Sequence, residues 1–241
     1  MKKHIPNFIT SLNLTSGFIA ILFAANGDIV SASWLILAAM VFDFLDGFAA
    51  RLLKAYSDIG KELDSLADVV SFGVGPAIIM HRLLQNTISS GPSDFFASGE
   101  AVKTLILLIP FIMPVCGALR LAKFNTDDTQ KTSFKGLPIP ANALAIISVV
   151  IAMHYSSSPI VGSFVSSVPA LVILTLVSSL LMVTRIPLLS LKTSHLKLKG
   201  NEGRYLMIVL IAAAFLIFGV AAATLIIPLY IVASLTALVI K

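Results

Sequence analysis

Long apolar stretches separated by short polar ones run along nearly the whole chain. Windows of about twenty residues, the length of helix that crosses a bilayer, predict eight spans: residues 7–26, 30–53, 61–84, 103–123, 138–156, 162–183, 204–220 and 223–240. Only Gly219 and Pro228 separate the last two, so a count of seven is the alternative. With no internal repeat to divide the chain, residues 1–241 are predicted to form a single domain, an all-α polytopic bundle of transmembrane helices.

The composition agrees with a membrane protein and excludes other classes. Hydrophobic residues make up 57% of the 241 residues and charged residues 12%, which is too apolar for a soluble domain. The net charge is +5, but the basic residues lie at helix ends rather than in one patch, so no nucleic-acid partner is predicted. The single cysteine, Cys116, excludes an intramolecular disulfide and a cysteine metal cluster.

The basic residues predict the orientation of the chain. Fifteen of the 17 Lys and Arg residues fall on one side of the eight-span topology, and only Arg82 and Lys103 fall on the other. Positively charged loops stay in the cytoplasm. The distribution therefore predicts a multi-pass protein of the cell inner membrane, with both termini in the cytoplasm.

Acidic residues gather where the hydropathy pattern predicts membrane depth. Six of the 12 acidic residues lie within residues 43–68. Asp43 and Asp46 are three apart and share a helix face, Asp64 and Asp68 are four apart and share another, and a short turn brings both pairs together at the cytoplasmic ends of their helices. Carboxylates at membrane depth are costly unless they line a polar cavity or bind a cation. The four aspartates are therefore predicted to form a functional site.

The residue types around the aspartates indicate a metal and a phosphate. Four like charges repel unless cations compensate them, and oxygen-only ligands favour Mg²⁺ or Mn²⁺ over Zn²⁺. Gly47 and Ala50 allow a ring or phosphate to approach the helix backbone, and Arg51 offers a fork of donors to a phosphate. The combination predicts a nucleotide-diphosphate site. Taken singly, the same pieces also fit a cation or proton relay, or a helix-packing contact.

Residues Asp43 to Asp68 spell DxxDGxxARx8GxxxDxxxD, which resembles, position for position, the signature of the CDP-alcohol phosphatidyltransferase family. The resemblance implies an integral membrane enzyme with one or two divalent cations. It implies that Asp43, Asp46, Asp64 and Asp68 bind metal and that Asp68 is also the general base. The implied substrate-binding residues, including two from the amino-terminal PNFIT segment, are Asn7, Thr10, Gly47, Ala50, Arg51, Ser57 and Gly60.

Three further segments resemble the branch of the family that uses serine. They are LDSLADVVSFGVGPA at 63–77, CGALRLAKFN at 116–125 and FKGLPIPANA at 134–143. The resemblance implies direct transfer of the phosphatidyl group from CDP-diacylglycerol to the hydroxyl of L-serine with release of CMP, among membrane lipids and in a homodimer. The alternatives are another acceptor, glycerol 3-phosphate or an inositol phosphate, or a cation-coupled transporter, which predicts carboxylates near the bilayer midplane and repeated halves.

Arg120 lies within the apolar segment ALRLAKF, where an unpaired cation is expensive. We hypothesise that Arg120 and Lys123 hold the serine carboxylate or a phosphate, and that Asn125 and Lys135 line the entrance. The alternative is that these residues only anchor the cytoplasmic ends of their helices.

Overall fold

The computed structural model describes residues 4–90, 99–126, 134–189 and 201–239. Helices account for nearly all of this part of the chain. Their bounds are α1 His4–Ala25, α2 Ile29–Leu52, α3 Asp58–Asp68, η1 Val69–Val74, α4 Gly75–Ser90, α5 Glu100–Leu108, η3 Ile109–Phe111, α6 Ile112–Thr126, α7 Ile139–Tyr155, α8 Pro159–Val165, α9 Val168–Val183, α10 Glu202–Phe218, η5 Gly219–Leu225 and α11 Ile226–Val239. Two short strands, β1 Phe134–Lys135 and β2 Pro187–Leu188, complete the described elements.

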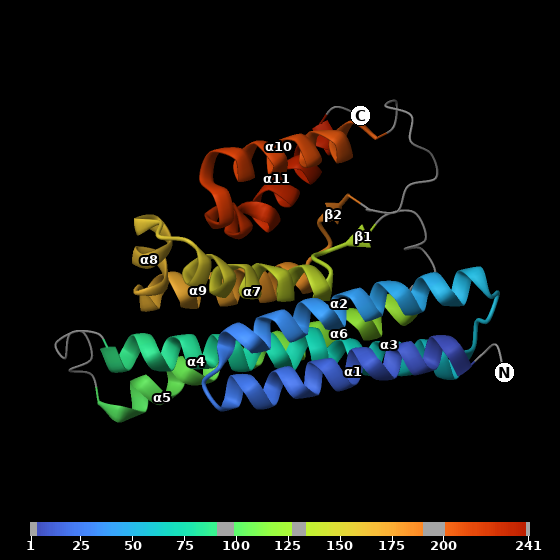
Figure 1. Cartoon of the computed structure of the whole chain (residues 1–241), viewed down its shortest axis with the longest axis horizontal. Coiled ribbons are helices and arrows are strands. Elements are labelled where there is room, and N and C mark those ends of the chain that lie inside the picture. The colour runs from blue at the N-terminus through green and yellow to red at the C-terminus, as the bar shows by residue number, and fades with distance from the viewer. Residues whose placement is uncertain (1–3, 91–98, 127–133, 190–200, 240–241) are drawn as a thin grey trace.

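The predicted all-α polytopic fold is confirmed. Within the described ranges, five helical stretches are long and apolar enough to cross a membrane, and the bent pair α8 and α9, which meet at 82°, makes a sixth if it acts as one span. This count is lower than the predicted eight for two reasons. Helix α7 has only 17 residues, and residues 202–237 count as one stretch of 36 residues although Gly219, with φ of +56°, ends α10. Helices α10 and α11 then pack against each other (Figure 1).

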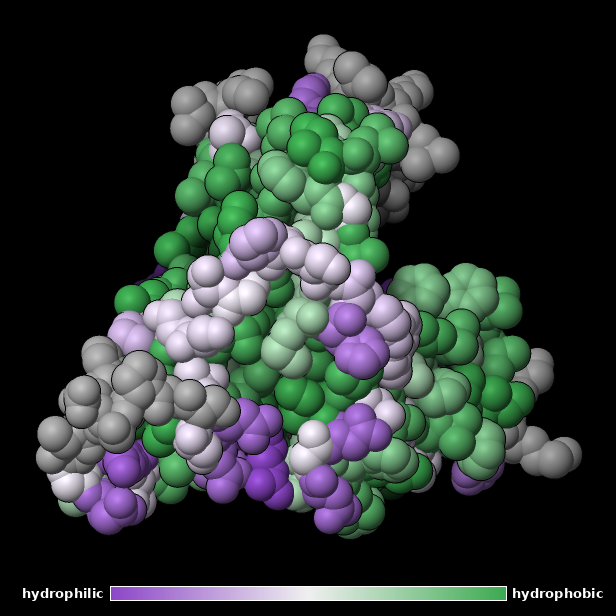
Figure 2. Space-filling model, turned by 60° about the vertical axis from the view of Figure 1, so that its left-hand side comes forward, coloured by the Kyte–Doolittle hydropathy of each residue, from purple (hydrophilic) through white to green (hydrophobic). Residues whose placement is uncertain are grey.

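The helices form three tiers that are stacked across the long axis of the molecule (Figure 1). Helices α1 to α6 make up one tier, α7 to α9 the next, and the pair α10 and α11 the third. Helix α7 lies at the centre, because it contacts α2, α4 and α9 as well as η5, and most of its residues are buried. Hydrophobic residues cover most of the face drawn in Figure 2, as expected for a surface that meets lipid.

A close approach of α1 to η1 positions the functional region. A Cβ added at Gly17 would lie 2.1 Å from Ser71 Oγ, so only glycine permits this contact. Ser71 Oγ donates a hydrogen bond to the Asn13 carbonyl oxygen at 3.1 Å. The segment η1 is a π-helical turn that begins directly after Asp68, and π turns are frequent at functional sites. The hydropathy pattern did not predict this turn, because it continues the apolar run of the neighbouring helices.

The strands β1 and β2 pair antiparallel over two residues and connect the start of α7 to the end of α9. Gly136 adopts φ of +77°, and its N–H donates to the Ile186 carbonyl at 2.9 Å. A Cβ at this position would lie 2.7 Å from the carbonyl oxygens of Met182 and Thr184. The residue pattern predicts no strand here, because a ladder of two residues leaves no alternation to detect.

Polar groups secure the end of the bundle opposite the acidic residues. The Asp28 carboxylate accepts a hydrogen bond from the Ser31 N–H at 3.0 Å and caps α2. Hydrogen bonding by Ser31 holds the pKa of Asp28 below its usual value. Arg82, one of the two basic residues predicted on this side, donates to the carbonyls of Ala24 and Ala25. These carbonyls belong to the last turn of α1, where the helix dipole favours a cation.

Candidate active site

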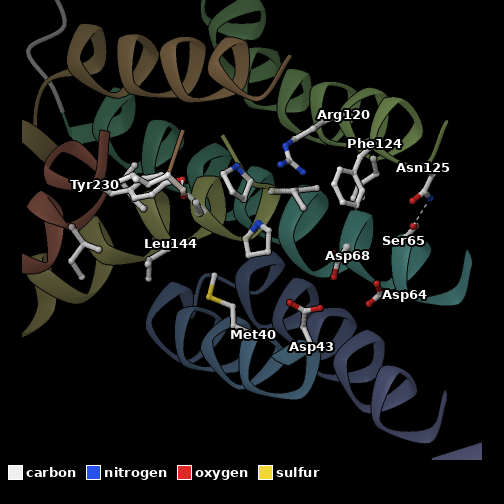
Figure 3. Close-up of a pocket in the computed structure, with 18 of the residues that line it drawn as sticks. Met40, Asp43, Asp64, Ser65, Asp68, Arg120, Phe124, Asn125, Leu144 and Tyr230 are labelled. Atoms are coloured by element: carbon white, nitrogen blue, oxygen red, sulfur yellow. Dashed lines mark hydrogen bonds between the residues drawn. The ribbon is translucent and has the colours of Figure 1, made fainter. Parts of the chain in front are cut away.

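Three of the four signature aspartates converge at one point. Asp43 comes from α2, and Asp64 and Asp68 come from α3. One carboxylate oxygen from each lies within 4.8 Å of the others, and Figure 3 shows the three side chains pointing toward a common space. Asp68 is buried, whereas Asp43 and Asp64 are half-buried. The four-residue spacing of Asp64 and Asp68 therefore places both carboxylates of α3 opposite the Asp43 carboxylate of α2.

Asp46 stands outside this group of three, although it is close to it. Its side chain is 5% exposed and lies beside the Thr10 hydroxyl of α1. Asp46 and Asp64 line one cavity together. Asp46 Oδ2 and Asp64 Oδ1 are buried, and neither has a hydrogen-bond partner among the described residues.

This set of donors fits a hard divalent cation. Every ligand is a carboxylate oxygen, the type that Mg²⁺, Mn²⁺ and Ca²⁺ prefer. Two buried acceptors without a partner are costly, and neighbouring carboxylates repel one another unless positive charge compensates them. The aspartate cluster can therefore hold a divalent metal.

A cavity of about 360 Å³ lies between α1, the end of α2 and the start of α3. All seven residues for which the family resemblance implies substrate contacts line this cavity. These residues are Asn7, Thr10, Gly47, Ala50, Arg51, Ser57 and Gly60. We call this space the small cavity.

The two glycines of the small cavity serve different purposes. A Cβ at Gly47 would meet nothing within 4 Å, so this position leaves a bare backbone beside open space. A Cβ at Gly60 would lie 2.9 Å from both Asn7 Oδ1 and Ser57 Oγ, so Gly60 lets α3 approach α1. Ser57 Oγ also accepts from the Gly60 N–H at 3.0 Å and caps α3. The small cavity thus combines exposed backbone with the Arg51 fork, as a phosphate site requires.

A second cavity of about 600 Å³, the large cavity, begins at the aspartates and extends toward α10 and α11. Asp43, Asp64 and Asp68 line one end of it (Figure 3). Asn125 also lines it, and its Nδ2 donates to Ser65 Oγ at 2.9 Å. Asp64 lines both cavities. The two cavities therefore meet at the carboxylates.

Arg120, which was proposed to bind the acceptor, reaches this space. Its side chain is 7% exposed, and its Nε is buried with no hydrogen-bond partner in the described part of the chain. Figure 3 shows the guanidinium projecting into the large cavity, within electrostatic range of Asp68 and Tyr230. Lys123 is exposed on α6 and does not line the cavity. The side chain of Lys135 lies outside the described part of the structure.

Two residues that adjoin the site were not among those predicted from the sequence. Asn13 is fully buried, and its Nδ2 donates to Asp68 Oδ1 at 3.3 Å. Its spacing from Thr10 and Gly17 places it on the buried face of α1, and this is the signal that could have found it. Tyr230 of α11 lines the large cavity opposite Arg120, but no local pattern marks it.

Fold and site together define a multi-pass membrane protein with a metal-suited acidic centre shared by two cavities. Comparison with known protein families identifies the family within this class. The profile of the CDP-alcohol phosphatidyltransferase family matches residues 3–183. The chain belongs to this family, and the predicted resemblance is confirmed.

Curated relatives support the same assignment. The chain is 37% identical over 148 residues to CDP-diacylglycerol–serine O-phosphatidyltransferase of Helicobacter pylori strain J99, covering 61% of this chain and 56% of the relative. It is 38% identical over 154 residues to archaetidylserine synthase of Methanothermobacter thermautotrophicus, covering 63% and 60%. It is 36% identical over 145 residues to CDP-diacylglycerol–serine O-phosphatidyltransferase of Bacillus subtilis strain 168, covering 60% of this chain and 74% of the relative. The match thus spans little more than half the length of the first two relatives.

Proposed function

We propose that the protein transfers the phosphatidyl group of CDP-diacylglycerol to the hydroxyl of L-serine and releases CMP. The observation that carries the proposal is the position of Asp64, which lines the small and the large cavity at once. A nucleotide in the small cavity and an acceptor in the large one would meet at the aspartates. The names of the relatives, two of which specify CDP-diacylglycerol and serine, support the choice of substrates.

The nucleotide end of the donor fits the small cavity. Arg51 offers paired N–H donors to the diphosphate, and the bare backbone at Gly47 allows the ribose or a phosphate to lie against α2. Mg²⁺ or Mn²⁺, one or two ions, bound by Asp43, Asp46, Asp64 and Asp68 would neutralise the phosphate oxygens and polarise the phosphorus.

The protein side chains of the large cavity act on serine. Asp68 accepts the hydroxyl proton while the serine oxygen forms its bond to the phosphatidyl phosphorus and the bond to the CMP oxygen breaks. The Asn13 amide, which donates to Asp68 Oδ1, orients this carboxylate. The Arg120 guanidinium binds the serine carboxylate, which supplies the counter-charge that a buried cation needs.

The proposal includes the setting of the enzyme. The distribution of Lys and Arg supports an inner-membrane protein with both termini and the active site facing the cytoplasm, where serine is available. The homodimer implied by the family resemblance remains a prediction.

An acceptor assay tests the proposal. Purified protein receives CDP-diacylglycerol, Mg²⁺ or Mn²⁺, and radiolabelled serine, glycerol 3-phosphate or inositol phosphate, and the labelled lipid is measured. Of the three acceptors, we expect only serine to give labelled lipid, and we expect Asp68→Asn to abolish this product. Asp58→Asn is the matched control, because Asp58 is exposed in the first turn of the same helix and should leave the rate unchanged. Product with a phosphorylated acceptor but not with serine, or full activity of Asp68→Asn, would overturn the proposal.

A further inference from the structure

The large cavity is completed by a part of the chain that the family profile does not cover. The profile ends at residue 183, yet the cavity wall includes side chains from the loop after β2, from α10 and from the start of α11. These side chains are Leu189, Met207, Ile211, Ile226, Ile227 and Tyr230. Met207 and Ile211 are four residues apart and so share one face of α10.

Hydrogen bonds hold this wall in place. The Tyr230 hydroxyl donates to the Leu189 carbonyl at 2.9 Å, and the Leu189 N–H donates to Ser234 Oγ at 3.2 Å. Leu189 directly follows β2, which pairs with β1 at the start of α7. Helix α10 packs tightly on α11, because a Cβ at Gly203 would lie 2.6 Å from the Ala237 Cβ. The pair α10 and α11 is therefore attached to β2, and α7 packs against both η5 and α11.

The polarity of the large cavity changes along its length. The aspartates and Asn125 line one end, Arg120 projects between, and Leu144 and Tyr230 lie toward the other end (Figure 3). Beyond Arg120 the wall from α10 and α11 consists of apolar side chains and one tyrosine. A cavity of about 600 Å³ is within the range of roughly 300–1,000 Å³ that ligand sites occupy. Its charged end and apolar end match the phosphate and the acyl tail of one lipid.

We propose that α10 and α11 form the acyl-chain wall for the lipid substrate and determine which chain lengths the enzyme accepts. This inference rests on the proposed function, since it assigns the tail of the same CDP-diacylglycerol. An acyl chain that moves from bilayer to protein gains little hydrophobic free energy, so close packing decides the fit. The shape of the wall is then more important than its hydrophobicity.

A larger side chain on this wall, which fills part of the large cavity, tests the inference. We expect Ile211→Phe to lower kcat/KM for dioleoyl CDP-diacylglycerol about tenfold, which corresponds to about 1.4 kcal/mol, and to leave kcat/KM for the dihexanoyl substrate nearly unchanged. Activity on the short substrate also shows that the variant is folded. Val209→Phe is the matched control, because Val209 lies on the opposite side of α10 and is 63% exposed. Equal losses on both substrates, or no loss on either, would overturn the inference.

Photolabelling tests the same contact without turnover. CDP-diacylglycerol with a diazirine near the end of its acyl chain is irradiated with the wild-type protein, and the labelled peptides are identified by mass spectrometry. We expect label in α10 or in the first turns of α11. Label confined to α1–α9 would contradict the inference. A protein that labels α10 but makes no lipid from serine would instead refute the proposed acceptor and leave the acyl-chain wall intact.

Discussion

Replacement of Asn13 by leucine should separate activity from stability. Asn13 is fully buried on α1, and leucine has nearly its shape without its polar atoms. The variant loses the hydrogen bond from Asn13 Nδ2 to Asp68 Oδ1. It also removes Asn13 Oδ1, a buried acceptor with no partner among the described residues. The two changes have opposite effects on the free energy of unfolding.

The magnitudes follow from these contacts. A hydrogen bond to a charged group contributes about 1.5–3 kcal/mol, and a buried acceptor without a partner costs about 1–3 kcal/mol. The free energy of unfolding should therefore change little. Asp68, in contrast, loses the group that orients it, so kcat should fall roughly ten- to a hundredfold. The KM for serine should stay constant, because Asn13 does not line the large cavity.

Two measurements on the same preparation check this prediction. Initial rates at varied serine concentration give kcat and KM, and a thiol-reactive fluorophore follows thermal unfolding. Cys116 is the single cysteine of the chain and is buried, so it reacts only as the protein unfolds. Asn26→Leu is the control, because Asn26 is exposed at the end of the same helix, where it donates to the Leu22 carbonyl, and this variant should keep full activity. If Asn13→Leu retained wild-type kcat, or lost activity only in proportion to folded protein, Asn13 would have no positioning role.

Four further predictions concern the cavities, the turn before α7 and the metal. Arg120→Ala should raise the KM for serine roughly ten- to a hundredfold, which corresponds to the loss of a hydrogen bond to a charged group. Lys123→Ala, at an exposed position, should leave this KM unchanged. Equal effects of the two substitutions in steady-state kinetics would show that Arg120 does not bind serine. Gly47→Leu places a side chain in the open space of the small cavity and should raise the KM for CDP-diacylglycerol about tenfold or more. If CDP inhibited this variant as strongly as it inhibits the wild type, the nucleotide would bind elsewhere. Gly136→Ala should lower the free energy of unfolding by about 1–3 kcal/mol, because of its positive φ and the carbonyls 2.7 Å from the new Cβ; a melting temperature equal to wild type would contradict that strain. A chelator should abolish product formation and added Mg²⁺ or Mn²⁺ should restore it, whereas activity that persists in the chelator would argue against a metal at the aspartates.

The sequence predicted those site residues whose positions depend on helical spacing and on contacts between neighbouring helices. Asp43, Asp64 and Asp68 meet because helical spacing fixes each face and the turn between α2 and α3 is short. The residues of the small cavity come from the same two helices and from α1, which packs closely against α2. Arg120 was recognisable because a cation in an apolar helix needs a partner.

The remaining residues depend on contacts between distant parts of the chain. Asn13 meets Asp68 across 55 positions, and a buried asparagine on a helix face looks like any packing residue. Tyr230 reaches Arg120 only because α11 folds back over α7, which hydropathy does not indicate. The sequence marks Arg120 as the more deeply placed cation but suggests the same ligand for Arg120 and Lys123. The packing around α6 determines that Arg120 enters the cavity while Lys123 stays exposed.

The position of Asp64 between the two cavities also bears on how the products separate. In the proposed reaction, CDP-diacylglycerol is cleaved into one part that dissolves in water and one that dissolves in the bilayer. At a centre that borders both cavities, the bond that breaks lies where the small cavity meets the charged end of the large one. CMP can then leave through the small cavity while the new phospholipid leaves past the apolar wall, so neither product has to cross the space that the other occupies.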